Sequence, residues 1–138
     1  MKTELISFGF KTNSIPGTNH LIDVRFLNNP FYIDELRELT GLDKEVINFF
    51  KEDPKVDEFL KEFFSWIEYI LKINKSANKE KIIIAIGCTG GQHRSPYITE
   101  YLAKHLADKN FAASEILVNH RELKKYNILK AEQIEVKN

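Results

Sequence analysis

The feature that most constrains the fold is an unbroken apolar run at residues 82–86, which leads through Gly87 into a polar loop. A continuous run of this kind, rich in β-branched residues, is typical of an interior strand that is buried on both faces. Beyond the loop, Ser95 is a good N-cap and Pro96 suits a first helical turn, so a helix is predicted to begin there. With a further strand predicted at residues 111–120, this order favours an α/β fold with a parallel or mixed sheet flanked by helices.

Periodicity predicts further strands and helices before this unit. They are two strands, at residues 2–10 and 21–26, and three helices, at residues 34–39, 43–50 and 54–73. In the long helix, the Phe and Trp stripe within residues 59–70 is expected to belong to the core. Neither a linker nor a repeat interrupts the 138 residues, so a single domain is predicted over residues 1–138.

The strand predicted at residues 21–26 has alternating polarity. Ile22, Val24 and Phe26 are expected to share one face, which is apolar. Asp23 and Arg25 are expected to share the other face, where they could contact solvent, each other or a ligand.

Composition narrows the class of protein. Hydrophobic residues make up 43% and charged residues 29%, which is typical of a folded domain rather than a disordered one. The longest apolar run is too short to span a bilayer and the N-terminus does not resemble a signal peptide, so we expect no membrane partner. One Cys cannot form an internal disulfide, which fits a cytoplasmic location. The spacing of the four His and one Cys does not suit a metal site, so neither metal nor cofactor is expected.

The charged residues are balanced in number but biased in type. There are 20 Lys and Arg against 20 Asp and Glu, so the global basic excess that favours nucleic-acid binding is missing. Only four of the basic residues are arginines: Arg25, Arg37, Arg94 and Arg121. Because Arg binds phosphate or carboxylate through two parallel hydrogen bonds and Lys cannot, each Arg is a candidate anion ligand.

Residues that can carry chemistry are densest in a stretch that we name the 88–95 loop. Its members are Cys88, Thr89, Gly90, Gly91, Gln92, His93, Arg94 and Ser95. The loop joins a buried strand to a helix N-terminus, where unpaired N–H groups and the helix dipole favour an anion. Hydroxyl groups, a guanidinium and glycines that allow close approach complete an anion-binding loop for phosphate or carboxylate.

Three interpretations of this loop stay open on the residues alone. It could be an ordinary strand-to-helix turn, although turn chemistry does not call for this set of polar side chains. It could be the phosphate loop of a cysteine-dependent phosphatase, with Cys88 as nucleophile, Arg94 as phosphate ligand and Asp23 or Asp43 as general acid. It could bind a phosphorylated molecule without covalent chemistry. A Walker A loop is excluded because its Gly-x4-Gly-Lys-Ser/Thr pattern does not occur.

Six collinear segments besides this loop carry a resemblance to a known family. They are Ser-Phe-Gly-Phe-Lys at 7–11, Asp-Val-Arg-Phe-Leu at 23–27, Asn-Pro at 29–30, Leu-Arg at 36–37, Thr-Gly-Leu-Asp-Lys at 40–44 and His-Arg-Glu-Leu-Lys at 120–124. Together with residues 85–95, they make the chain resemble the C-terminal domain of the RapZ family of RNase adapter and nucleotide-binding proteins.

The resemblance implies a regulatory domain that binds an amino-sugar phosphate, glucosamine 6-phosphate, and in some members small RNA and a ribonuclease. Family members usually carry an N-terminal P-loop domain, and its motif is absent from this sequence, so nucleotide binding of that kind is not expected. In some members the pocket includes a ring His directly after the Asn-Pro pair, and this chain has Phe31 at that position, a difference that could change the ligand. The basic C-terminus that serves RNA in enteric members corresponds to Lys124, Lys125 and Lys130 here, interleaved with acidic and apolar residues.

Under this resemblance, side chains outside the 88–95 loop receive roles as well. Asp23 is expected either to accept hydrogen bonds from a sugar amine or hydroxyl or to orient Arg94, and Arg25 to be a second anion ligand. Independently of the resemblance, His93 within the loop is expected either to donate to a phosphate oxygen or to face solvent at the helix N-terminus. His120 and Arg121 are expected to border either the same cleft or an interface between subunits of a homo-oligomer.

Overall fold

The apolar run at residues 82–86 lies in β3 (Lys81–Cys88), an interior strand that pairs with a neighbour on each side. In the computed structural model, which describes residues 1–12, 14–109 and 115–123, four strands form one sheet in the order β2-β3-β1-β4. The other strands are β1 (Lys2–Gly9), β2 (His20–Asp23) and β4 (Ile116–His120), and every pairing is parallel. The predicted α/β class is confirmed, and the sheet is parallel rather than mixed.

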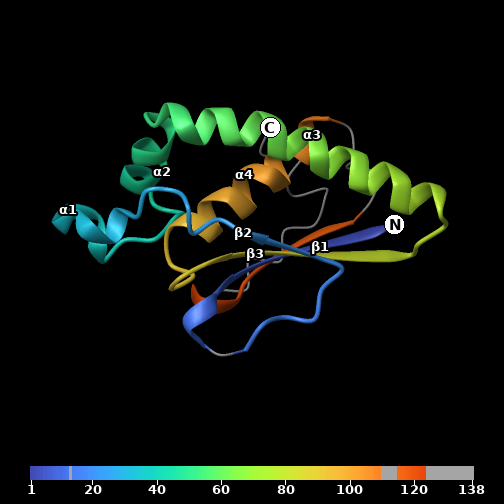
Figure 1. Cartoon of the computed structure of the whole chain (residues 1–138), viewed down its shortest axis with the longest axis horizontal. Coiled ribbons are helices and arrows are strands. Elements are labelled where there is room, and N and C mark those ends of the chain that lie inside the picture. Colours follow the sequence, from blue (N-terminus) through green and yellow to red (C-terminus); the bar gives the residue numbers. More distant parts are fainter. Residues whose placement is uncertain (13, 110–114, 124–138) are drawn as a thin grey trace.

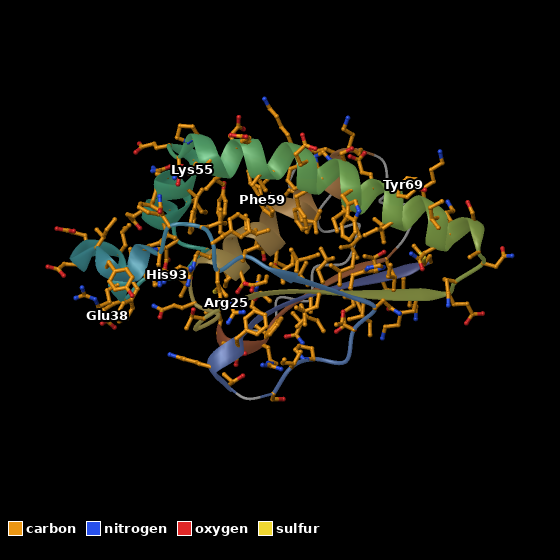
Figure 2. The ribbon with its side chains drawn as sticks, in the orientation of Figure 1. Arg25, Glu38, Lys55, Phe59, Tyr69 and His93 are labelled. Atoms are coloured by element: carbon orange, nitrogen blue, oxygen red, sulfur yellow. The ribbon has the colours of Figure 1, made fainter. Side chains whose placement is uncertain are left out.

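The helices cover one face of this sheet (Figure 1). They are α1 (Asp34–Arg37), α2 (Lys44–Lys51), α3 (Pro54–Ser76) and α4 (Arg94–Asp108), with short 3-10 turns η1 (Phe10–Thr12), η2 (Pro30–Tyr32) and η4 (Arg121–Leu123). The main core lies between the helices and the sheet, where side chains of both layers fill the space (Figure 2). It includes Ile84 and Ile86 of β3 together with Ile67, Ile98 and Leu102 of the helices. A smaller apolar cluster of Ile6, Phe8 and Ala85 forms separately from it.

Strand β2 is shorter than predicted, and the orientation expected for Phe26 is wrong. The strand ends at Asp23, and the Asp23 carboxylate accepts a hydrogen bond from the backbone N–H of Arg25 at 2.9 Å. Such a local bond turns the backbone out of the extended conformation. Phe26 is consequently 65% exposed and packs edge-on against Phe59, with the ring centroids 5.1 Å apart.

Trp66 does not belong to the core stripe of α3, contrary to the sequence prediction. The buried positions of α3 are Val56, Leu60, Phe63, Ile67, Ile70 and Leu71. Trp66 precedes Ile67 and is therefore rotated by one residue, about 100°, from the buried seam. Its side chain is 49% exposed and meets the His20 ring edge-on.

Helix α4 begins at Arg94, one residue before the predicted cap. Its N-cap residue is His93, which makes no side-chain capping bond. Ser95 lies inside the first turn, and its hydroxyl bonds to the neighbouring strands instead of to its own helix. The last strand, predicted at residues 111–120, is observed from Ile116, and residues 110–114 lie outside the described residues. None of the helices in the described ranges has the length and apolar character needed to cross a bilayer.

Candidate functional site

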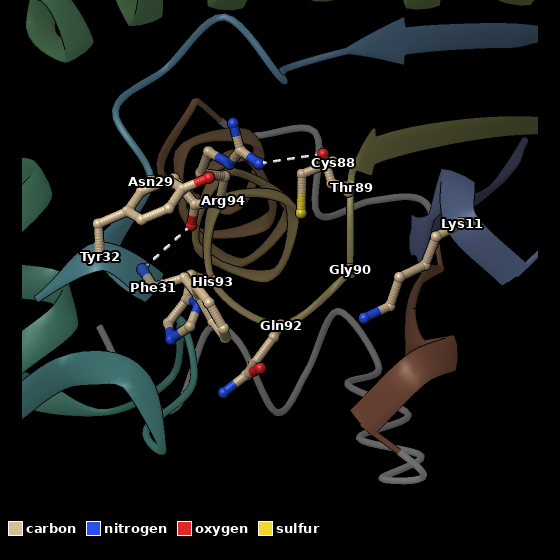
Figure 3. Close-up of a pocket in the computed structure, with 10 residues that line it drawn as sticks. All are labelled: Lys11, Asn29, Phe31, Tyr32, Cys88, Thr89, Gly90, Gln92, His93 and Arg94. Atoms are coloured by element: carbon tan, nitrogen blue, oxygen red, sulfur yellow. Dashed lines mark hydrogen bonds between the residues drawn. The ribbon is translucent and has the colours of Figure 1, made fainter. Parts of the chain in front are cut away.

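The 88–95 loop borders a cavity of about 220 Å³ at the carboxyl ends of β1 and β3 (Figure 3). Gly9 at the end of β1 is paired with Cys88 at the end of β3, so the segments that follow the two strands lie together. The loop contributes Cys88, Thr89, Gly90, Gln92, His93 and Arg94 to the lining. Lys11, Asn29, Phe31 and Tyr32 complete it. The location fits the general rule that ligands of parallel α/β sheets bind outside the carboxyl ends of the strands.

The backbone of this loop is rich in N–H groups without a protein partner. No N–H of residues 89–94 donates a hydrogen bond to any residue that the structure describes. The N–H of Ser95 is the next along the chain, and it donates to the Cys88 sulfur at 3.4 Å. Unpaired amides at the N-terminus of a 15-residue helix add to the positive end of its dipole, a combination that attracts anions.

Arg94 supplies a guanidinium to the same cavity although only 5% of the residue is exposed. Its Nη1 donates to the backbone carbonyls of Arg25 at 2.6 Å and Leu27 at 3.1 Å, which fixes the side chain. Its Nη2 lies 3.4 Å from the Thr89 hydroxyl, and its buried Nε has no partner among the described residues. The guanidinium is thus anchored on one side and still has unused donors.

Cys88 and Ser95 form a buried pair behind the loop. The Cys88 Sγ lies 3.2 Å from the Ser95 hydroxyl oxygen, and the Ser95 hydroxyl also donates to the carbonyl of Phe8 at 3.2 Å. Cys88 is 2% exposed but its side chain contributes to the cavity wall. Because the Ser95 hydroxyl gives its one proton to Phe8, its oxygen accepts from the Cys88 thiol, and the backbone N–H of Ser95 is the donor to sulfur that would stabilise a thiolate.

The side chains of Gln92 and His93 hold another segment of the chain against the loop. Gln92 Nε2 donates to the carbonyls of Arg37 and Leu39, both at 2.7 Å, and His93 Nε2 lies 2.9 Å from the carbonyl of Leu36. The contact with Gly41 is so close that a Cβ there would lie 2.2 Å from the His93 carbonyl oxygen. Both side chains therefore use hydrogen-bonding groups to position residues 36–41 against the loop.

Burial lowers the pKa of His93, because the charged imidazolium would lose solvation, and the hydrogen bond with Leu36 offsets only part of that effect. The folded protein then binds this proton less readily than the unfolded chain, whose His pKa is about 6.5. Stability is therefore expected to fall as the pH drops below about 6.5. Urea unfolding between pH 7.5 and 5 measures this, and His93→Gln is expected to flatten the profile. Equal slopes for wild type and His93→Gln would contradict the assignment.

Asp23 and Arg25 lie beside the cavity and pair with each other. The Arg25 Nη2 is 2.7 Å from Asp23 Oδ2, and both side chains are about half exposed. The hydrogen bond from Arg25 lowers the pKa of Asp23, and the charge of Arg94 lowers it further. The Arg25 guanidinium also lies over the Phe10 ring at 4.0 Å. Asp23 pairs in register with Gly87, so its carboxylate stands at the edge of the loop rather than among the residues that line the cavity.

His120 and Arg121 lie on the β1–β4 side, away from the lining residues. His120 is 1% exposed and joins Ser7, at 2.7 Å from Nδ1, to Glu100, at 2.8 Å from Nε2. Arg121 pairs with Glu122 at 2.8 Å. The Glu122 carboxylate accepts the N–H of Gly9 at 2.8 Å, so this turn supports the back of the loop.

The family model described as the RapZ C-terminal domain matches residues 1–124. The chain belongs to the RapZ C-terminal domain family. Within this RapZ-type domain, no cluster of His, Cys, Asp and Glu in the described ranges is arranged to hold a metal ion.

Curated relatives agree with this assignment. A nucleotide-binding protein of Shewanella halifaxensis is 48% identical over 118 residues, which cover 86% of this chain and 40% of the relative. Nucleotide-binding proteins of Listeria welshimeri and Lactiplantibacillus plantarum are 42% and 41% identical over 122 residues. These matches cover 88% of this chain and 40% of each relative. The RapZ-type domain thus spans about 40% of the length of the curated relatives it matches.

The cavity includes side chains that reasoning from the sequence did not assign to a site. Lys11 extends from the turn after β1, and its Nζ lies near Gly90, on the opposite side of the loop from Arg94 (Figure 3). Tyr32 comes from the η2 turn and is 79% exposed. A signal for Lys11 was available, because a residue that directly follows one parallel strand is brought close to the loop that follows its neighbour.

Proposed function

We propose that this RapZ-type domain binds a small phosphate monoester, specifically an amino-sugar phosphate such as glucosamine 6-phosphate, as a regulatory domain. The observation that carries the proposal is the set of partner-free N–H groups at residues 89–94 beside the anchored guanidinium of Arg94. A phosphate oxygen accepts several hydrogen bonds at once. The amides of the loop can donate these bonds without first breaking a bond within the protein.

The size and charge of the cavity support a small ligand. Its volume of about 220 Å³ lies below the range of roughly 300–1,000 Å³ that is common for drug-sized molecules. Lys11 and Arg94 line it, and no carboxylate does so among the described residues, which favours an anion. In this proposal the phosphate lies on the loop amides, with Arg94 and Thr89 as side-chain ligands, and the sugar amine faces Asp23 at the edge of the loop. The Ser95 hydroxyl, predicted as a ligand, is instead buried against Phe8 and Cys88.

Ligand-induced stabilisation tests this function. Glucosamine 6-phosphate at 100 times its dissociation constant is expected to stabilise the fold by about 2.7 kcal/mol, measured as a shift of the urea or thermal midpoint. Glucosamine without phosphate is the matched control and should leave the midpoint unchanged. If none of the three phosphates (glucosamine 6-phosphate, glucose 6-phosphate and inorganic phosphate) shifts the unfolding midpoint at millimolar concentration, the proposal is wrong.

A second candidate, a cysteine-dependent phosphatase, is favoured by the Cys88–Ser95 pair and by the five-residue spacing between Cys88 and Arg94. The general acid is its weak point, since Asp23 is bonded to Arg25 and Asp43 accepts the N–H of Thr40 at 2.7 Å. Hydrolysis of an aryl phosphate that Cys88→Ser abolishes would support it. No hydrolysis by the wild type, or hydrolysis that survives Cys88→Ser, removes this candidate.

An adapter role toward RNA or a ribonuclease is the further proposal that family membership supports. Its candidate contacts, Lys124, Lys125 and Lys130, lie outside the described residues. Binding through these lysines should weaken steeply with salt and upon neutralisation of Lys124 and Lys125 to Gln. If RNA affinity does not change with salt or with the two Lys→Gln substitutions, any RNA binding occurs at another surface.

A further inference from the structure

Two large aromatic side chains stand at the mouth of the cavity. Phe31 is 47% exposed and Tyr32 is 79% exposed, and both belong to its lining. Their rings contact each other edge-on at 5.9 Å between centroids. Exposed aromatic rings beside a hydrogen-bonding pocket are typical of sites where the ligand presents an apolar face.

The turn that carries these rings is held in place by several hydrogen bonds. Asn29 Oδ1 accepts the N–H of Phe31 at 3.1 Å, and the N–H of Ile33 donates to the carbonyl of Pro30 at 2.9 Å. Arg37 Nε donates to the carbonyl of Phe31 at 2.9 Å, and its guanidinium lies 5.3 Å from the centre of the Phe31 ring. The backbone that carries the two rings is therefore ordered before any ligand arrives.

The aromatic rings and most of the phosphate donors of the cavity come from different segments of the chain. Figure 3 shows Phe31 and Tyr32 on one side of the loop and Lys11 on the other. The donors for phosphate come from the loop and from Lys11 and Arg94, whereas the η2 turn offers mainly aromatic surface. A ligand whose phosphate binds the loop would meet this surface with the rest of its body.

We infer that Phe31 and Tyr32 form a stacking wall for the ring of the ligand, so that the site selects cyclic over open-chain phosphate monoesters. This inference rests on the proposed function. A pyranose ring has a face of C–H groups that packs against an aromatic ring, whereas an open-chain polyol presents no flat face and loses more conformational freedom on binding. Tyr32 is the more exposed ring and contributes most of the contact.

A matched pair of probes tests the wall. Glucose 6-phosphate and glucitol 6-phosphate carry the same phosphate on the same six-carbon skeleton, and the ring form distinguishes them. Calorimetric titration is expected to give about tenfold tighter binding of the cyclic probe, equivalent to about 1.4 kcal/mol, and inorganic phosphate reports on the loop alone.

Variants then locate the preference. Tyr32→Ala is expected to remove most of the tenfold difference between the cyclic and open-chain probes, and Phe31→Leu to reduce the difference partly. Tyr69→Ala is the matched control, because Tyr69 is also exposed, at 61%, but lies on α3 outside the lining.

The outcomes separate the two proposals. Phosphate binding with equal affinity for the cyclic and open-chain probes, or a preference that survives Tyr32→Ala, overturns the stacking wall alone. Absence of binding for all three probes overturns the proposed function and the wall together.

Discussion

Arg94→Ala is expected to abolish phosphate binding and to lower the free energy of unfolding by about 2–4 kcal/mol. The Nη1 of Arg94 donates to the carbonyls of Arg25 and Leu27. Loss of the side chain removes this donor, and both carbonyl oxygens then lose a hydrogen bond at a largely buried position. The same loss removes the guanidinium from the cavity. Urea unfolding measures the first effect, and titration with inorganic phosphate measures the second.

Arg94→Lys separates the two contributions of this side chain. Lysine keeps the positive charge but cannot bond two carbonyls and an anion through one planar group. We expect Arg94→Lys to bind phosphate at least tenfold more weakly and to recover part of the stability. Lys61→Ala controls for the loss of a cation, because Lys61 is exposed on α3 and its ion pair with Asp57 spans 3.9 Å. Wild-type affinity for phosphate in Arg94→Ala would show that the loop is not the anion site.

The elements that are specified locally could be predicted from the sequence. The apolar run of β3 and the polar loop after it carry their own signals, since burial on both faces and helix initiation act on neighbouring residues. Strand β1 was predicted at residues 2–10 and observed as Lys2–Gly9 for the same reason. Family resemblance then extended the prediction to almost the whole chain, and the family model confirmed it over residues 1–124.

Features that depend on distant contacts could not be predicted. The side-chain partners of Gln92 and His93 are carbonyls of Arg37, Leu39 and Leu36, more than 50 positions earlier in the chain, and the sequence did not predict these bonds. Tyr32 reaches the cavity because the η2 turn folds back toward the loop, and no local pattern predicts that approach. Tertiary contacts thus decide which side chains face the cavity.

Asp23 shows the same limit at shorter range. Alternation predicted that Asp23 and Arg25 share a face of one strand, and they do contact each other. The strand nevertheless ends at Asp23, because its carboxylate bonds to the N–H of Arg25 and bends the chain. The alternation of side chains along a strand does not predict that the Asp23 side chain will bond to a nearby backbone N–H and so end the strand.

Gly91→Ala is expected to have the second large effect, a loss of about 2–5 kcal/mol in the free energy of unfolding. Gly91 has a φ of +73°, a left-handed conformation that costs an L-residue about 1–2 kcal/mol. A Cβ at this position would also lie 2.5 Å from Glu122 Cγ, 2.8 Å from the Gly9 nitrogen and 2.9 Å from the Phe8 carbonyl carbon. Overpacking of this kind typically adds 1–3 kcal/mol.

Relief of that overlap would have to dismantle the support of the loop. Glu122 cannot move freely, because its carboxylate accepts the N–H of Gly9 and pairs with Arg121, and Gly9 is fixed in β1. Gly91→Ala should therefore also weaken phosphate binding, since the loop can accommodate the methyl group only by shifting its amides.

Gly90→Ala is the matched control for Gly91→Ala, one residue away in the same loop. A Cβ on Gly90 would meet only the flexible end of Lys11, 3.6 Å from Nζ and 3.7 Å from Cε, so the free energy of unfolding should change by less than about 0.5 kcal/mol. Urea unfolding of both variants, followed by phosphate titration of each, makes the comparison. If the two alanine variants unfold at the same urea concentration, the Glu122 turn does not hold the loop in place, and the partner-free amides at residues 89–94 lose the rigid support that makes them an anion site.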